Sequence, residues 1–205
     1  ASFAAVKQAF GNDDARLINE WVQAGILGPV REVHIWTNRP IWPQGLPRPT
    51  WPPTERGPEA DASWWPGDVA GRVADAIGGD FAPPEGFDWE LWRGPEAEDV
   101  AYHPIFHPFH WRGWTPFGVG ALGDMGAHLV DHPYWALDLG YPESIEATST
   151  PWGGGSEDPA TYPLAMKVHY RFPRRGLQPP VDLHWYDGGL MPRRPDVIPP
   201  EVEFD

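Results

Sequence analysis

Hydrophobic and polar residues recur with two different periods along this chain of 205 residues. In four segments the apolar residues lie three or four positions apart, which is typical of a helix with one packed face. The first follows the capping residues Asn12-Asp13-Asp14 and ends at Gly25, and the last carries Leu122, Met125, Leu129 and Trp135. The predicted helices are 13–24, 66–77, 88–92 and a central helix from 122 that breaks or kinks near Pro133.

A period of two predicts the strands. Residues 30–37 are rich in β-branched and aromatic side chains, and residues 144–150, 164–172 and 181–186 alternate apolar and polar positions. Such alternation is typical of half-buried antiparallel strands with one face on a core. Helices precede most of the strands without a βαβ rhythm, so we predict an α+β fold with a predominantly antiparallel sheet. We expect a single domain over residues 1–205, joined by long loops rich in Pro and Trp.

Composition narrows the possible functions. The formal net charge of −14 argues against nucleic-acid binding and against binding to an anionic membrane, since both need clusters of Lys and Arg. No apolar run approaches the roughly 20 residues of a membrane-spanning helix. The chain has no cysteine, so its stability depends on packing alone. It has 27 Pro and 13 Trp, and such Trp residues serve either in cores and interfaces or as stacking surfaces for sugar rings.

The central helix carries the strongest candidate chemistry. Asp124 and His128 are four positions apart, which places a carboxylate and an imidazole on one helix face, and Asp131 lies near the same line. A carboxylate beside an imidazole is a common arrangement for proton transfer at neutral pH. The alternative is structural: Asp124 caps the first helical turn or forms a salt bridge there, and His128 is a hydrogen-bonded core residue.

Other motifs are weaker. Residues 118–123 match G-x-G-x-x-G, but no buried strand precedes them, so we interpret the glycines as the start of a helix or a close approach of backbone to a ligand. Several histidines suggest a metal, yet His103, His107 and His132 precede prolines, which disfavours a shared helical face. A metal site of His107 or His110 with Asp124 and His128 stays open, but we assign no metal. The chain has no G-x-S-x-G motif, and no pair of acids has a spacing that indicates a glycosidase.

Four segments occur in the order of one known family. They are Trp36–Gly45 (WTNRPIWPQG), His107–Trp114 (HPFHWRGW), Gly120–Asp131 (GALGDMGAHLVD) and Trp185–Gly189 (WYDGG). Over nearly its whole length the chain resembles the C-terminal, substrate-side domain of Gfo/Idh/MocA-type oxidoreductases. It departs from that pattern at about residues 56–84, which look like an insertion, and at His110, where Asn or a similar residue is expected.

The resemblance implies a large, mostly antiparallel sheet with helices on one face and an open face that is often used for homo-oligomerisation. Asp124 and His128 match the family's Asp-x-x-x-His pair beside the reacting sugar hydroxyl. There the His exchanges the hydroxyl proton and the Asp orients it. The remaining residues that the resemblance places at the sugar are Asn38, Arg39, Trp42, His110, Arg112 and Trp114. For each Trp the alternative is core packing.

The same resemblance implies an NAD(P)-binding Rossmann domain, to which nothing in this chain is similar. Residues 1–11 look like a remnant that joins such a domain, so we expect no cofactor on this chain alone. The first hypothesis is therefore the carbohydrate-binding half of a sugar oxidoreductase. A second is a nicotinamide-independent glycoside hydrolase or lyase with Asp124 and His128 as acid and base, and a third is a non-catalytic assembly protein. The sequence does not specify the sugar or the cellular compartment.

Overall fold

The computed structural model describes residues 13–50, 66–95 and 100–203. The chain divides into two compact units, and each unit is built from separate stretches of sequence. Unit 1 comprises Ala1–Arg39, Leu122–Thr148 and Ala165–Asp205, and unit 2 comprises Pro40–Ala121 and Ser149–Leu164. The single predicted domain thus contains two units. The expected remnant at 1–11 lies outside the described residues, as does the first part of the expected insertion at 56–84.

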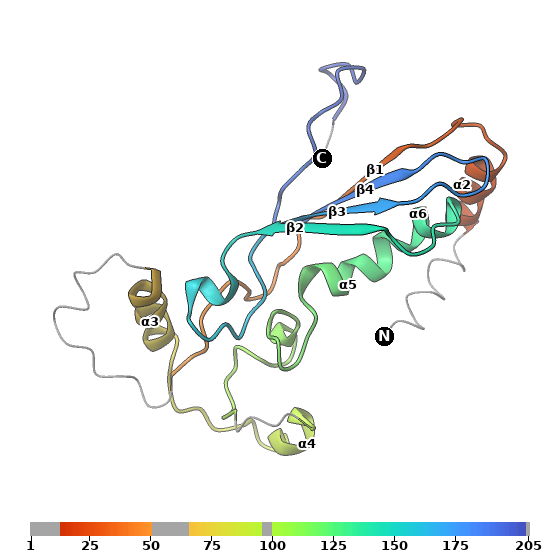
Figure 1. Ribbon diagram of the computed structural model, residues 1–205. Coiled ribbons are helices and arrows are strands. Elements are labelled where there is room, and N and C mark those ends of the chain that lie inside the picture. Colours follow the sequence, from red (N-terminus) through yellow and green to blue (C-terminus); the bar gives the residue numbers. More distant parts are fainter. Residues whose placement is uncertain (1–12, 51–65, 96–99, 204–205) are drawn as a thin grey trace. The chain divides into compact units, whose positions relative to one another are not determined.

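Unit 1 contains a four-stranded sheet (Figure 1). Its strands are β1 (Glu32–Trp36), β2 (Ser144–Ser149), β3 (Met166–Phe172) and β4 (Val181–Tyr186), in the order β1-β4-β3-β2. Each strand lies within a segment that the alternation predicted. β3 and β4 pair antiparallel, as expected, whereas β1 pairs with β4 in parallel, with Val33 opposite Leu183. The predicted α+β class is confirmed, and the sheet is mixed but mostly antiparallel; its four strands in the described chain do not confirm the large sheet that was expected.

The parallel pairing of β1 with β4 is possible because a long stretch of chain separates them. Alternation reports which face of a strand is buried and does not report the direction of its neighbour. Parallel neighbours need a crossover of a dozen or more residues, and here all of unit 2 and two other strands lie between β1 and β4 in the sequence.

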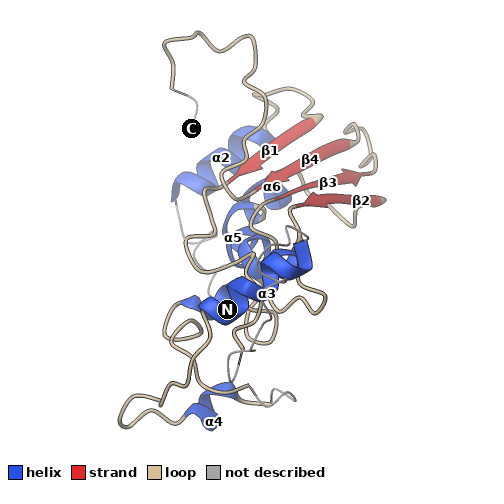
Figure 2. Cartoon of the chain, turned by 90° about the vertical axis from the view of Figure 1, so that its left-hand side faces the viewer, coloured by secondary structure: helices blue, strands red, loops and turns tan. Residues whose placement is uncertain are grey.

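Helices α5 (Gly120–Leu129) and α6 (Asp131–Ala136) lie on the same side of the sheet in two views (Figures 1 and 2). The predicted apolar stripe is confirmed, since Leu122, Met125 and Leu129 pack against a core centred on the sheet. The buried residues of this core are Ile35, Leu139, Val168, Phe172, Val181, Leu183 and Trp185.

The predicted break in the central helix falls at Val130, between α5 and α6. Pro133 lies in the first turn of α6, where a residue without a backbone N–H is tolerated. The first described helix, α2 (Asp13–Gln23), begins with two aspartates that favour the positive end of the helix dipole, and Gly25 follows it at φ 79°. α2 packs against α6.

Unit 2 is organised around an aromatic core rather than a sheet. Helix α4 (Trp89–Arg93) places Trp89 in it, and Asp88 caps this helix by accepting a hydrogen bond from the Leu91 N–H at 2.9 Å. Helix α3 (Pro66–Ala76) also belongs to unit 2, as do two 3-10 turns, η2 (His110–Gly113) and η3 (Trp152–Gly155). The buried residues of the core are Trp89, Val100, Tyr102, Phe106, Trp114 and Ala160.

Candidate functional site

Helix α5 presents Asp124 and His128 one turn apart, as predicted. Both side chains are partly exposed, although the helix packs its apolar stripe on the core of unit 1. Asp124 is the fifth residue of α5, beyond the first turn, so it is not an N-cap. His128 lies in the last turn of the helix. Of the structural alternative, the N-cap role of Asp124 is excluded, and His128 is partly exposed rather than buried.

Asp131 begins α6 immediately after this pair. Its Oδ2 atom is buried and has no hydrogen-bond partner. A buried carboxylate oxygen without a donor is costly, so Asp131 is a candidate acceptor close in sequence to His128.

Asn38 and Arg39 directly follow β1, in unit 1. The Arg39 guanidinium donates to Asn38 Oδ1 at 3.4 Å, and the Arg39 carbonyl accepts from the Gly188 N–H at 2.6 Å. The structure therefore brings the WTNR and WYDGG segments together at the ends of β1 and β4.

The buried side chain of Asp187 stabilises this junction. Its side chain is 1% exposed and accepts hydrogen bonds from the backbone N–H of Met166 and the indole Nε1 of Trp185. Burial raises the pKa of the Asp187 carboxyl, although both hydrogen bonds oppose that effect. Asp187 was not among the predicted site residues. Its position directly after a strand and before two glycines was the signal that could have indicated it.

The other predicted sugar contacts lie in unit 2. The Arg112 guanidinium lies over the rings of Phe109 and Trp111, at 4.6 and 4.5 Å from their centroids, and 5.9 Å from that of Trp42. It also donates to the carbonyl of Phe109. His110 has a buried Nδ1 without a partner. Arg112 is therefore surrounded by aromatic rings in a cation–π arrangement.

Trp42 and Trp114 are core residues. Trp42 is 5% exposed and donates its indole N–H to Gln44, while Trp114 is 1% exposed in the aromatic core. A tryptophan that stacks on a sugar must present a ring face to the ligand. For these two residues the structure supports the core-packing alternative and not the expected stacking surface.

The glycines at 118–123 have structural roles. A Cβ atom on Gly118 would lie 2.4 Å from the Arg112 carbonyl oxygen, and one on Gly120 would lie 2.7 Å from Cγ of Tyr162. Gly120 has φ 64° and starts α5, and the residues before it form turns at Trp114 rather than a strand. The interpretation as a helix start is confirmed, and this loop does not fit a dinucleotide.

The histidines of the 103–110 segment do not converge. His103 is held by Ile77 and Ile105 through both ring nitrogens, and His107 packs on Phe87 and Trp92. Within the described ranges, no group of three or more His, Cys, Asp and Glu residues is arranged to hold a metal ion.

A row of three histidines crosses the face of the sheet opposite its core. His34, His184 and His169 are in register on β1, β4 and β3, and their rings stack at 4.9 and 4.4 Å. Each outer ring has an acidic partner: His34 contacts Glu32 at 2.9 Å, and His169 contacts Asp182 at 2.7 Å. Lys167 and Glu146 lie beside His169 and His184 around a small hollow.

The central ring of this row, that of His184, has a lowered pKa. Burial, together with the neighbouring His169 and His34, lowers the pKa of His184, and Glu32 opposes this only in part. The row was not predicted, because it depends on a strand register that no single segment reveals.

No known protein-family profile matches the chain, and no curated protein matches it either. Among the helices that the structure describes, none is long and apolar enough to cross a membrane.

Proposed function

We propose that this chain is the carbohydrate-binding part of a sugar oxidoreductase of the Gfo/Idh/MocA type. The observation that carries the proposal is the Asp124–His128 pair on α5, one turn apart and partly exposed. In the proposed reaction His128 exchanges the proton of the sugar hydroxyl, and Asp124 orients the imidazole.

Two further observations support the proposal. A sheet covered by helices on one face agrees with the fold that the resemblance implies. The junction of the WTNR and WYDGG segments places Asn38 and Arg39 together, and an amide beside a guanidinium suits hydroxyl groups. Arg112 and His110 belong to unit 2, so the proposal, which rests on unit 1, assigns them no contact, and the buried Trp42 and Trp114 present no ring face to a ligand.

In this proposal the chain binds the sugar, and the nicotinamide is bound elsewhere. The glycines that resemble a nucleotide loop pack against neighbouring parts of the chain, so we assign no NAD(P) contact to them. A homo-oligomer formed through the open sheet face belongs to the same proposal, and light scattering on the purified protein tests it.

The test is calorimetric titration with a panel of aldoses, inositols and NAD(H). We expect a sugar or polyol to bind and NAD(H) not to bind. His128→Ala and Asp124→Asn should each weaken that binding about tenfold, the value of one hydrogen bond to a charged group. His132→Ala is the matched control, because His132 is an exposed histidine on the next helix.

Other outcomes separate the remaining hypotheses. Turnover of an aryl glycoside that both variants abolish would favour the hydrolase. An oligomer that binds no saccharide would favour the assembly protein, and tight binding of NAD by this chain would contradict the proposal.

A further inference from the structure

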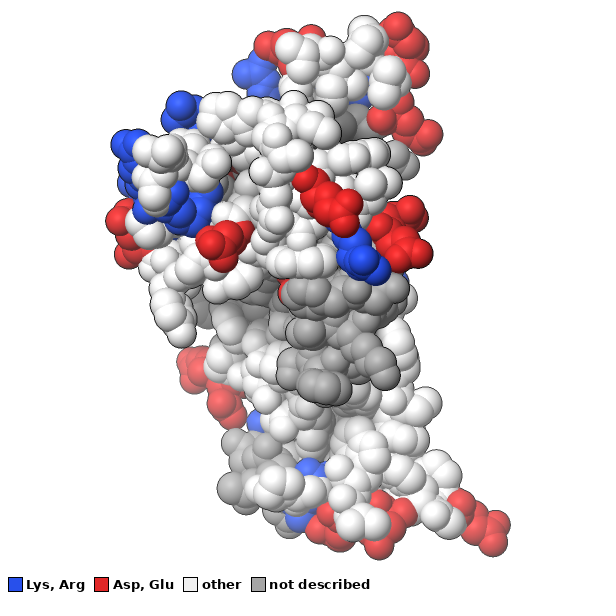
Figure 3. Space-filling view, turned by 90° about the vertical axis from the view of Figure 1, so that its right-hand side faces the viewer, with Lys and Arg blue, Asp and Glu red and all other residues white. Residues whose placement is uncertain are grey.

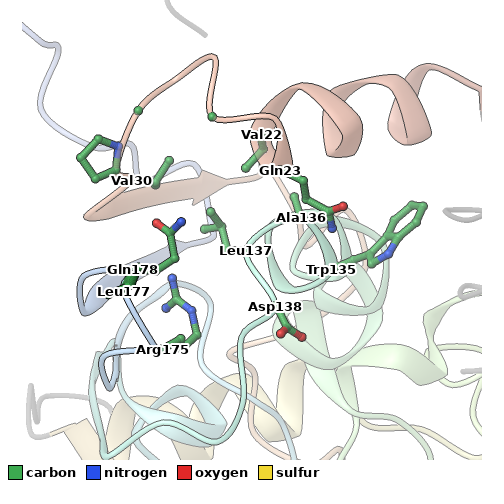
Figure 4. Close-up of a pocket in the computed structure, with 13 residues that line it drawn as sticks. Val22, Gln23, Val30, Trp135, Ala136, Leu137, Asp138, Arg175, Leu177 and Gln178 are labelled. Carbon is green, nitrogen blue, oxygen red and sulfur yellow. The ribbon is translucent and has the colours of Figure 1, made fainter.

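Unit 1 contains a second candidate site, a hollow of about 690 Å³ (Figure 4). None of the residues considered above for sugar binding lines it. Its walls come from the end of α2, the turn into β1, the end of α6 and the β3–β4 hairpin. Its volume is within the usual range of small-molecule sites, about 300–1,000 Å³. Its lining includes the side chains of Val22, Gln23, Val30, Leu137, Asp138, Arg175, Leu177 and Gln178.

The hairpin holds Arg175 rigidly at this hollow. Arg175 and Gln178 exchange two backbone hydrogen bonds, of 3.2 and 2.8 Å, across a two-residue turn whose Gly176 has φ 55°. Both side chains line the hollow (Figure 4).

Two nitrogens of the half-buried Arg175 guanidinium are shielded and have no hydrogen-bond partner. Its Nε and Nη1 atoms are both shielded from solvent, and neither has a hydrogen-bond partner. A buried charged donor without an acceptor is strongly unfavourable, and native proteins seldom retain one without a reason. A carboxylate in the hollow can pair with the part of the guanidinium that lines it, because its two oxygens match the planar N–H groups of arginine.

The charge at the hollow has both signs. Asp138 lines it together with Arg175, and its carboxylate is near enough to favour the charged guanidinium, although burial lowers the pKa of Arg175. Asp138 adopts φ 49°, an unusual conformation for a residue other than glycine, which the turn after α6 imposes. A second anion on the ligand would meet this carboxylate, whereas an amine would pair with it.

Three further arginines lie at this end of the sheet, together with the acidic residues Glu32 and Asp182. Arg31 precedes β1, Arg171 lies in β3 and Arg174 follows β3, in a chain whose net charge is −14. Figure 3 shows that Lys and Arg gather on one part of this face, while Asp and Glu are more widely spread.

We propose that this hollow binds a small zwitterion of the amino-acid type. The ligand carboxylate accepts hydrogen bonds from Arg175, its ammonium group pairs with Asp138, and the amides of Gln23 and Gln178 complete the polar contacts. The ligand's apolar part lies against Val22, Val30, Leu137 and Leu177.

The test begins with a thermal-shift screen of the twenty amino acids on the whole chain, followed by calorimetry of those that raise Tm. Acetate and butylamine serve as the two halves of the ligand. We expect at least one amino acid to bind, and each half to bind at least about tenfold more weakly. If no amino acid binds, or if acetate alone binds equally well, the assignment is wrong.

Variants locate the binding. Arg175→Gln should weaken it at least about tenfold, a value typical of a lost charge-assisted hydrogen bond. Asp138→Asn, which suits the same backbone conformation, should weaken amino-acid binding but not acetate binding. Arg193→Gln removes the same charge from an exposed position outside the lining and should leave binding unchanged. Full binding by Arg175→Gln would overturn the proposal.

A stability measurement separates a binding role from a structural one. Arg175→Met removes the two unsatisfied donors, so it should raise the Tm of the ligand-free protein by about 2–4 °C. A structural arginine would behave in the opposite way, and a fall of several degrees would contradict the proposal.

Discussion

Removing the Asp187 carboxylate should destabilise unit 1 more than most single substitutions. Its two oxygens accept from the Met166 N–H at 2.6 Å and from the Trp185 indole N–H at 2.9 Å. Asp187 is 1% exposed and Trp185 is fully buried, so water cannot replace the lost acceptor without rearrangement. Asp187→Ala therefore leaves two buried donors without partners.

The expected cost follows from these contacts. Each unsatisfied buried donor costs about 1–3 kcal/mol, so two cost about 2–6 kcal/mol. Removing a carboxylate that burial has made unfavourable offsets part of this, and we expect a net loss of about 3 kcal/mol for Asp187→Ala. Asp187→Asn retains one acceptor but directs its amide N–H₂ at the indole or at the backbone N–H. It should lose about 1–2 kcal/mol, less than the alanine variant.

Urea denaturation at neutral pH, followed by circular dichroism, measures both losses. Asp196→Ala is the control, since the Asp196 side chain is 88% exposed and pairs only with an exposed arginine. Its free energy of unfolding should change by no more than about 0.5 kcal/mol. The reasoning fails if Asp187→Ala is as stable as the wild type, or if the asparagine variant loses more than the alanine variant.

Two further predictions concern the histidine row and the start of α5. The pKa of His184 is lowered in the folded protein, so the unfolded chain takes up the proton first, and stability falls as the pH drops below about 6.5. His184→Gln should reduce this acid-side slope in denaturation curves between pH 7 and 5, whereas His132→Gln should leave it unchanged; equal slopes would remove the explanation. Gly120→Ala combines a positive φ with a Cβ 2.7 Å from the Tyr162 ring, so it should cost about 2 kcal/mol or more in thermal unfolding. Gly140→Ala has open space around its Cβ and should cost little, and similar Tm values for the two would show that the loop accommodates the methyl group.

Local patterns predicted most of the elements of this protein. The stripe of Leu122, Met125 and Leu129 required a helix packed on a core, and the alternation in 181–186 matched β4 at both ends. Asp88 and Gly94 marked the ends of α4, because capping depends on neighbouring residues alone.

The features that were missed depend on distant residues. The direction of β1 relative to β4 and the row of His34, His184 and His169 both follow from a pairing between segments far apart in the chain. The burial of Trp114 could not be distinguished from a ligand-stacking role, since both use the same side chain. Arg175 had no sequence signal, because its lack of partners is a property of the packed hairpin.

The parallel neighbour of β1 has a consequence for how this protein is made. His34 and Tyr186 touch across 152 positions, so β1 emerges from the ribosome long before the strand that covers its edge. Until β4 is synthesised, that edge stays open to incorrect partners, and closing so large a loop slows the final step. Unit 2, whose first stretch is contiguous, can begin to condense during this wait. Slower translation prolongs the time for which the edge of β1 is uncovered. It should therefore change the yield of soluble protein through mispairing of the sheet rather than through the aromatic core.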